Sequence, residues 1–332
     1  MRRTPPKRGG KRTFAVPGDP ADPGSFAAVG ADWLEWLAAH NYSRATMVGH
    51  SFYLAGFASW AELRGLHRPA DVTLPVLEAY QRHLSLRRKP DGTPLSWSTQ
   101  ARPLVALRSF FSWCAKSRRT LANPASGLVM PRQSHKLPSA TLTHSEAEAV
   151  LAVPDTATVT GLRDRAVMEL LYATAMRRGE LVGLRLADVD LARGWLTLRE
   201  TKTRWDRVVP MGERAAAWLV RYLAESRPKL VTDDAVTAVF LATNGERLGA
   251  NWLTAQVHHY LEASGVGKPG SCHLFRHSAA TLMLEGGADL RYVQELLGHR
   301  SLASTHIYTR VAPERLAAVH RATHPGAALP PA

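Results

Sequence analysis

The segment Pro131 to Ser139 separates two halves of this chain that differ in pattern and in charge. It begins with a proline, holds a second one and is otherwise mostly polar, which is typical of an extended linker. At 332 residues the chain is also long for one hydrophobic core, since a domain usually takes roughly 100 to 200 residues. We therefore predict two folded domains, residues 26–130 and 141–326, joined by a linker at 131–140. Residues 1–25 are predicted to be a basic arm without fixed structure, and 327–332 a short tail.

Positive charge is concentrated before the linker. Residues 1–139 hold 20 Lys and Arg against 8 Asp and Glu, whereas residues 140–332 hold 22 against 20. The net charge of the whole chain is +14, which indicates a polyanionic partner. We expect the first half to bind nucleic-acid backbone and the second half to carry chemistry that is more local.

The composition argues against membrane and secreted proteins. No stretch of about 18 uncharged apolar residues is present, so no membrane span is predicted. The basic start is not followed by the apolar core of a secretory signal. Two cysteines, Cys114 and Cys272, are too few for a disulfide framework and fit a reducing compartment. The predicted location is the cytoplasm.

Hydrophobic periodicity predicts an all-helical first half. Apolar residues recur at three-to-four spacing in four segments, Asp32–His40, Ala45–Leu63, Leu74–Arg87 and Ser98–Ser117. Aromatic residues near the last of these are expected in the core, namely Trp97, Phe110, Phe111 and Trp113. The interleaved bases are expected on a surface that faces DNA: Arg82, Arg87, Arg88, Lys89, Arg102, Arg108, Lys116, Arg118 and Arg119.

The second half mixes helices with one predicted hairpin. Thr143 with Glu146 three residues later is a capping-box pattern that begins a helix. The alternating runs Trp195–Arg199 and Arg207–Pro210 predict two paired strands with Lys202 near the turn. Further helices are predicted at Gly161–Ala173, Arg214–Ala224, Trp252–Ser264, Phe275–Leu284 and Leu290–Leu297.

Four residues near the carboxyl end have the chemistry that phosphoryl transfer to a tyrosine requires: His273, Arg276, His299 and Tyr308. A tyrosine hydroxyl has a pKa of about 10, so it needs neighbouring positive charge or a base to react at neutral pH. Arg276 follows His273 by three positions and lies on the same helical face, so both side chains can address one phosphate. Arg177 supplies a second guanidinium, and two guanidinium groups can hold both non-bridging phosphate oxygens.

The same residues carry a family resemblance. In order along the chain there are Leu171-Tyr172-Ala173-Thr174-Ala175-Met176-Arg177, a hairpin lysine, His273-Leu274-Phe275-Arg276-His277, Leu297-Gly298-His299 and a tyrosine nine residues later. The chain thereby resembles the tyrosine recombinase (integrase) family, most closely its Xer-type members. That resemblance implies a mainly α fold, with a helical, SAM-like core-binding domain followed by a mixed α/β catalytic domain that carries a small antiparallel sheet.

The resemblance also implies a reaction, which is site-specific recombination of double-stranded DNA. Tyr308 would attack a phosphate and form a 3′-phosphotyrosyl link, with Lys202 protonating the leaving oxygen. His273 and His299 would assist proton transfer, and Glu180 would support the site. Neither ATP, a metal nor another cofactor is expected. Four protomers, identical or shared with a second recombinase, would exchange strands between two DNA sites through a Holliday junction, at the nucleoid.

Several alternatives stay open at this stage. Arg178 competes with Arg177 for the first arginine position, and Arg204 competes with Lys202 in the hairpin. A metal site is a further alternative, built from Cys272, His273 and His277 with His258 and His259 upstream. At the level of function, the alternatives are a type IB-like topoisomerase and a catalytically silent DNA-binding protein. The end of the chain, Arg315 to Pro325, resembles the family's final helix, which weighs against a topoisomerase.

Overall fold

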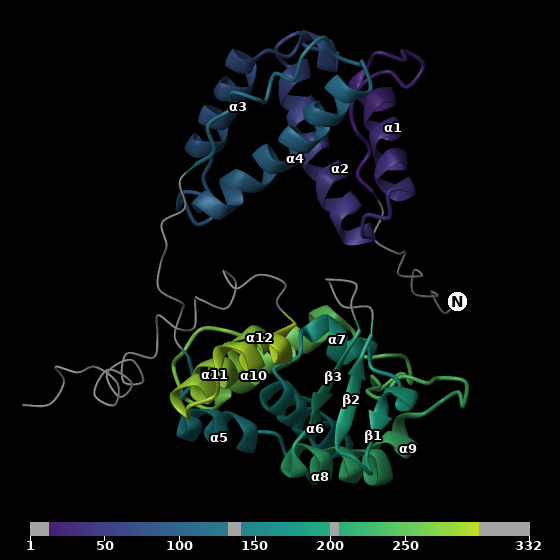
Figure 1. Ribbon diagram of the computed structural model, residues 1–332, viewed down its shortest axis with the longest axis vertical. Coiled ribbons are helices and arrows are strands. Elements are labelled where there is room, and N and C mark those ends of the chain that lie inside the picture. The colour runs from purple at the N-terminus through teal and green to yellow at the C-terminus, as the bar shows by residue number, and fades with distance from the viewer. Residues whose placement is uncertain (1–12, 132–140, 200–205, 299–332) are drawn as a thin grey trace, which may run out of the picture. The chain divides into compact units, whose positions relative to one another are not determined.

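The computed structural model describes residues 13–131, 141–199 and 206–298 (Figure 1). The chain forms two compact units, Met1–His135 and Lys136–Ala332, so the division falls inside the predicted linker. Each unit has its own cluster of buried hydrophobic residues. The described ranges are mostly helical with one small antiparallel sheet, which confirms the predicted fold class. Within these ranges no helix combines the length and the apolar character needed to cross a membrane.

The described part of the first unit, residues 13–131, has four helices: α1 (Phe26–Ala39), α2 (Arg44–Glu62), α3 (Leu74–Leu86) and α4 (Trp97–Lys116), with a short 3₁₀ turn, η1 (Pro69–Asp71), before α3. Serine caps set three of the starts, because the hydroxyls of Ser25, Ser43 and Ser96 accept hydrogen bonds from backbone N–H groups three residues on. Helix α1 therefore begins at Phe26, earlier than the predicted Asp32.

The core of the first unit lies between α2 and its neighbours, since α2 packs against α1 and α4, and α4 also packs against α3. Phe110 and Phe111 are fully buried there, as predicted. Trp97, also predicted in the core, is instead 54% exposed and is the first residue of α4. Residues 13–25, predicted as part of the arm, contact this unit: the Phe14 N–H donates to Ser51 Oγ at 2.9 Å.

The second unit begins with α5 (His144–Ala152), α6 (Val159–Thr174), α7 (Arg178–Gly183) and a 3₁₀ turn, η2 (Leu186–Asp188). The predicted capping box is confirmed, because Thr143 Oγ1 accepts from the Glu146 N–H and Glu146 Oε2 accepts from the Thr143 N–H. Three antiparallel strands follow in the order β1 (Val189–Asp190), β2 (Trp195–Leu198) and β3 (Arg207–Pro210). The predicted hairpin is confirmed as β2 and β3, with Leu198 opposite Arg207.

The remaining elements are α8 (Glu213–Arg221), a π-helical turn, η3 (Tyr222–Ser226), α9 (Arg227–Leu230), α10 (Ala250–Ala263), α11 (Cys272–Glu285) and α12 (Leu290–Leu297). Helix α6 is central, because it packs against both α8 and α11. Helix α11 in turn packs against α10 and α12, and these three helices lie together in Figure 1. Gly298 ends α12 in the left-handed conformation, with φ of 61°.

Candidate active site

The turn between α6 and α7 presents the first predicted arginine. Ala175 takes the left-handed conformation at the end of α6, with φ of 50°, and redirects the chain. Arg177 then becomes the N-cap of α7, and its N–H donates to Glu180 Oε2 at 2.8 Å. Its Nη1 donates to Glu180 Oε1, also at 2.8 Å. Main chain and side chain of Arg177 are thus held by one carboxylate.

A second arginine holds the same carboxylate. Arg207 Nη1 and Nη2 donate to Glu180 Oε1 and Oε2, both at 2.9 Å, in the bidentate geometry that favours charged pairs. Burial of Glu180 raises the pKa of its carboxyl, but the hydrogen bonds from Arg207 and Arg177 outweigh that effect, so the pKa lies below its usual range. Glu180 is therefore charged at neutral pH and fixes two guanidinium groups.

Arg276, on α11, is the third arginine of the site and is only 5% exposed. Its Nη1 donates to the carbonyl of Ala175 at 2.6 Å, and its Nη2 donates to the carbonyl of Leu297 at 2.7 Å. These bonds join the end of α6 to the end of α12. The backbone therefore sets the position of this buried charge.

The three arginines meet at the carboxyl end of α12. Arg207 Nε donates to the carbonyl of Leu296 at 3.1 Å, Arg276 Nη2 to that of Leu297, and Arg177 Nη2 to that of Gly298 at 3.1 Å. Carbonyls at the end of a helix have no partner within it and carry the negative end of the helix dipole. Three successive carbonyls thus accept from three different guanidinium groups, and we call Arg177, Arg207 and Arg276 the arginine cluster.

The structure brings together three of the predicted residues, Arg177, Glu180 and Arg276. His273 lies one turn before Arg276 on α11 and is exposed. Lys202, His299 and Tyr308 lie outside the described residues, so their roles stay predictions. In the sequence, Lys202 falls between β2 and β3, and His299 directly follows Gly298.

Arg178, the alternative to Arg177, points elsewhere. Its Nη1 donates to Thr254 Oγ1 on α10, whereas Arg177 shares Glu180 with Arg207. His277, half-buried on α11, has a pKa below its ordinary value because of burial and then of the nearby His273 and Arg276. A neutral imidazole is therefore expected beside the arginine cluster.

The metal alternative finds no support in the described part of the chain. No group of three or more His, Cys, Asp or Glu side chains lies close enough together there to hold an ion. Cys272 is buried, and burial raises the pKa of its thiol to about 11.

Arg207 is the residue of the site that sequence reasoning missed. Arg207 is the first residue of the second predicted strand, but a strand pattern does not show which carboxylate a side chain contacts. The available signal was its place at the end of the hairpin loop that carries Lys202.

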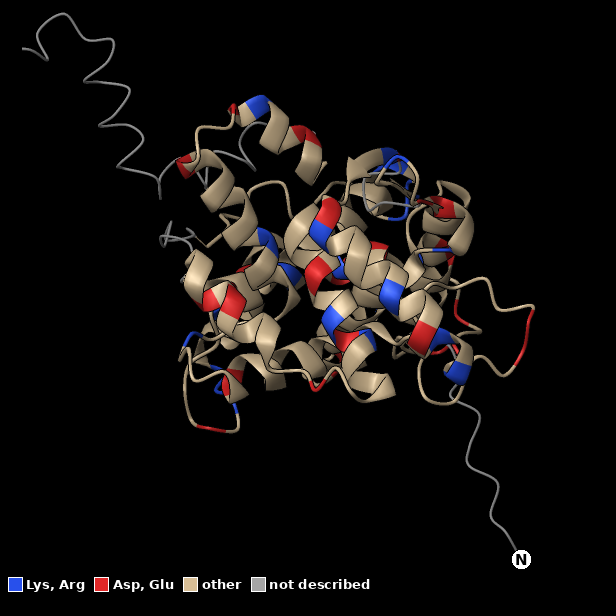
Figure 2. Ribbon diagram, turned by 90° about the horizontal axis from the view of Figure 1, so that it is seen from below, with Lys and Arg blue, Asp and Glu red and all other residues tan. Residues whose placement is uncertain are grey.

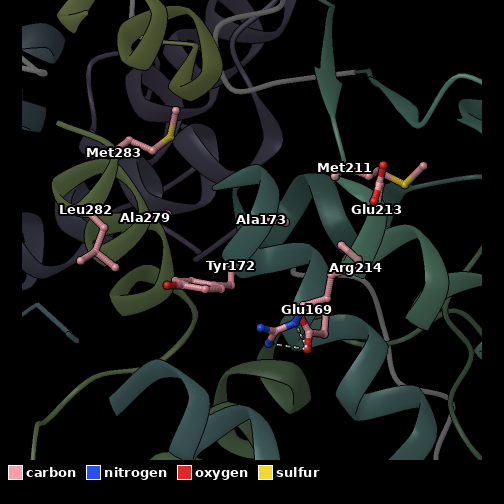
Figure 3. A pocket seen from close by; sticks show the side chains of 11 residues that line it. Glu169, Tyr172, Ala173, Met211, Glu213, Arg214, Ala279, Leu282 and Met283 are labelled. Atoms are coloured by element: carbon pink, nitrogen blue, oxygen red, sulfur yellow. Dashed lines mark hydrogen bonds and ion pairs between the residues drawn. The ribbon is translucent and has the colours of Figure 1, made fainter. Parts of the chain in front are cut away.

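A separate pocket of about 400 Å³ lies between α6, α11 and the start of α8 (Figure 3). Its walls are mostly apolar and include Tyr172, Met211, Leu282 and Met283. Arg214 donates to Glu169 at its edge, through Nε at 3.0 Å and Nη2 at 2.8 Å. No member of the arginine cluster lines this pocket.

Comparison with known proteins gives the family. Residues 140–315 match the model of the phage integrase family. The chain is 47% identical over 292 residues to tyrosine recombinase XerC 2 of Ralstonia nicotianae, covering 88% of this chain and 84% of that protein. It is 36% identical over 300 residues to tyrosine recombinase XerD of Lacticaseibacillus casei, covering 89% and 98%.

Solved structures share the fold. A structure of the XerH site-specific recombinase bound to a palindromic difH substrate has a TM-score of 0.68 at 23% identity, covering 88% of this chain and 84% of that one. A lambda integrase tetramer bound to a Holliday junction has a TM-score of 0.64 at 17% identity, covering 86% and 77%. From the family match and the level of identity to its relatives, the chain belongs to the phage integrase family of tyrosine recombinases and is similar to its Xer-type members.

Proposed function

We propose that this chain is a site-specific recombinase that cuts and rejoins double-stranded DNA through a tyrosine. The arginine cluster is the observation that supports this most directly. Arg177 and Arg276 are held close to one another by the carbonyls of Leu297 and Gly298, in a chain that is 47% identical to a tyrosine recombinase. Two fixed guanidinium groups suit a phosphodiester with two non-bridging oxygens.

In the proposed site, Arg177 and Arg276 bind the scissile phosphate and stabilise the charge that grows on it in the transition state. Both are positioned before substrate arrives, so little reorganisation is needed when the reaction occurs. Glu180 keeps Arg177 in place without reacting. The exposed His273, one turn from Arg276, is the described histidine best placed to reach the same phosphate.

The reaction exchanges one phosphoester bond for another. The Tyr308 hydroxyl gives its proton to His273 or His299 as its oxygen bonds to phosphorus. The bond from phosphorus to the 5′ oxygen breaks, and Lys202 gives that oxygen its proton. The product is a 3′-phosphotyrosyl link and a free 5′-hydroxyl. Attack by a 5′-hydroxyl from the partner strand reverses the exchange and releases Tyr308, with His273 and His299 assisting proton transfer. Because each phosphoester bond that breaks is replaced by another, the scheme needs neither ATP nor a cofactor.

The proposed assembly has four protomers on two DNA sites. The lambda integrase tetramer on a Holliday junction, which shares this fold at a TM-score of 0.64, supports the proposal. The four protomers are either identical or shared with a second recombinase. The proposed location is the cytoplasm, at the nucleoid.

A plasmid assay separates this function from its alternatives. A supercoiled plasmid carries two direct copies of the DNA that flanks the protein's own gene, and is incubated with the full chain and with Tyr308→Phe. A recombinase produces two smaller circles, which the variant does not form. Relaxed circles without recombinants would instead indicate a topoisomerase, and salt-sensitive binding without either product would indicate a silent DNA-binding protein.

A further inference from the structure

Arg207 joins three parts of the second unit through one side chain. It is the first residue of β3, its Nη atoms hold Glu180 on α7, and its Nε donates to the carbonyl of Leu296 on α12. The side chain is only 12% exposed. Because the guanidinium is planar and all three of its nitrogens are engaged with protein atoms, its orientation is fixed.

The contacts of Arg207 place it one interaction away from Arg177. Glu180 accepts from both arginines, and its Oε1 receives one hydrogen bond from each, at 2.8 Å from Arg177 and 2.9 Å from Arg207. Without Arg207, the Glu180 carboxylate would keep its hydrogen bonds with Arg177. The two side chains could then move together. The position of Arg177 therefore depends on Arg207, although the two side chains come from different elements.

The backbone at the end of α12 also packs closely against the Arg207 side chain. A Cβ atom built on Gly298 would lie 3.1 Å from Cζ and Nη1 of Arg207 and 3.2 Å from its Cδ. The chain passes this close only because residue 298 is a glycine, which also tolerates the φ of 61° found there. Gly298 is followed in the sequence by His299, so Arg207 supports the turn from which that residue continues.

We infer that Arg207 is a positioning residue for the proposed DNA cleavage. It holds Glu180, and through it Arg177, and it holds the end of α12 against the hairpin whose loop carries Lys202 in the sequence. It acts through these groups, because among the described residues its side chain donates hydrogen bonds to Glu180 and to the carbonyl of Leu296. This inference rests on the proposed function and assigns to the same site a residue outside its predicted catalytic set.

The test is single-turnover cleavage of a nicked suicide duplex made from the DNA that flanks the gene, with the full chain at saturating concentration. We expect Arg207→Ala to lower the cleavage rate about 100-fold, because misplacing a reacting group by about 1 Å has an effect of that size. DNA affinity should stay unchanged. Arg207→Lys keeps the charge but cannot reach both Glu180 oxygens and Leu296, so its rate should lie in between, and it keeps the test open if the alanine variant does not fold.

A matched control is Arg227→Ala. Arg227 also holds main-chain carbonyls of the second unit, those of Val236 and Ala238 at 2.9 Å, and none of its contacts belongs to the arginine cluster. Its loss should lower the thermal unfolding temperature and leave the cleavage rate of the folded protein unchanged. A purely structural role for Arg207 would give the same result.

A double-mutant cycle with Glu180→Gln identifies the route. If Arg207 acts through Glu180, then Arg207→Ala slows the Glu180→Gln chain much less than it slows the wild type. This inference would be overturned if Arg207→Ala cleaved DNA at the wild-type rate, or if the two substitutions had strictly additive effects on the rate. The proposed function would be unaffected by either result. A wild-type chain that forms no covalent adduct would overturn the proposed function, and this inference with it.

Discussion

The two units of this protein use arginine in different ways. In the first, the ion pairs of the described residues are Arg68 with Asp22 and Arg119 with Asp32, and these arginine side chains are 56% and 37% exposed. The second unit also has exposed pairs, such as Arg193 with Asp190, but at its site Arg177 and Arg207 share the buried Glu180 and are only 19% and 12% exposed. The charged residues can be followed along the helices in Figure 2.

The difference fits two functions toward one polyanion, which are binding and catalysis. Residues 1–139 have 20 basic residues against 8 acidic ones, and such an excess binds phosphate backbone wherever it meets it. Catalysis instead needs charge in one place before substrate arrives, which requires partners that hold each guanidinium still. We propose that exposed charge sets DNA affinity and that fixed charge sets the cleavage rate, and the predictions below test that division.

The largest effect is expected for Arg276→Ala. It removes a buried guanidinium that joins Ala175 to Leu297, and the loss of one preorganised donor typically slows a reaction about 100- to 1000-fold. Single-turnover cleavage and equilibrium DNA binding, measured on the same duplex, separate the two contributions. Arg276→Lys keeps a charge without the planar fork and should remain slow. Equal losses of affinity and rate would contradict the division between the units.

Glu180→Gln tests whether fixed charge depends on a carboxylate. Because it leaves the partly buried Arg177 and Arg207 without their charged partner, it should lower the free energy of unfolding by about 3 kcal/mol at pH 7. The pKa of Glu180 lies below its usual range in the folded protein, so its stabilisation is present above the unfolded pKa of about 4.3 and is lost as the pH falls through the lowered value. The gap between variant and wild type should therefore close in acid.

Asp164 gives the control with the opposite sign. Burial raises the pKa of its carboxyl despite the nearby Arg163 and Tyr260. Its contribution to stability is thus fullest below its unfolded pKa and falls as the pH rises through the raised value. Denaturant unfolding of Asp164→Asn should show a gap to wild type that widens in acid. Parallel behaviour of the two variants would show that the two carboxyl groups do not differ as described.

Gly298→Ala should have a smaller effect, and it tests whether a change in cleavage rate can be distinguished from a change in stability. The left-handed backbone costs an alanine about 1 to 2 kcal/mol, and the new Cβ would also meet Arg207 at 3.1 Å. Gly267→Ala is the matched control, because Gly267 has a φ of 71° and open space around it. Gly298→Ala should lose at least as much unfolding free energy as Gly267→Ala, and slower cleavage is expected for Gly298→Ala alone. Equal cleavage rates would show that the contact with Arg207 has no consequence.

The smallest effect is expected in the first unit. Arg102 is exposed on α4, and Arg102→Gln should reduce the slope of log K against log salt concentration by about 0.9 if it contacts one phosphate. Cleavage at saturating protein should not change. Arg68→Gln is the control, because that guanidinium already pairs with Asp22 at 3.0 Å. A slower saturated reaction in Arg102→Gln would mean that the first unit also sets the rate.

Much of the fold was predictable because each long helix has one buried face. Helix α3 was predicted over Leu74–Arg87 and extends over Leu74–Leu86. Helix α1 begins earlier than predicted, because the three-to-four spacing of its buried face extends back through Val29 to Phe26, where Ser25 caps the helix. Helix α7 was not predicted, since it is six residues long and its N-cap is Arg177 instead of a serine or threonine.

The site was predictable only in part. The resemblance to the tyrosine recombinase family, matched in order along the chain, selected Arg177, Glu180 and Arg276, which the structure places together. Physics in the sequence alone did not separate Arg177 from Arg178, because the choice depends on the left-handed turn at Ala175. Arg207 escaped prediction because its partner Glu180 lies 27 residues away along the chain. Lys202, His299 and Tyr308 stay predictions.

The nucleophile is the central claim, and covalent trapping tests it most directly. The full chain and Tyr308→Phe are incubated with duplex DNA that flanks the gene and are quenched with detergent, and the DNA-linked peptide is mapped by mass spectrometry. Tyr292→Phe is the matched control, since Tyr292 is 72% exposed on α12 and has no assigned role. We predict an adduct on Tyr308 that persists in Tyr292→Phe and disappears in Tyr308→Phe. An adduct on another residue, or an undiminished adduct in Tyr308→Phe, would contradict the account.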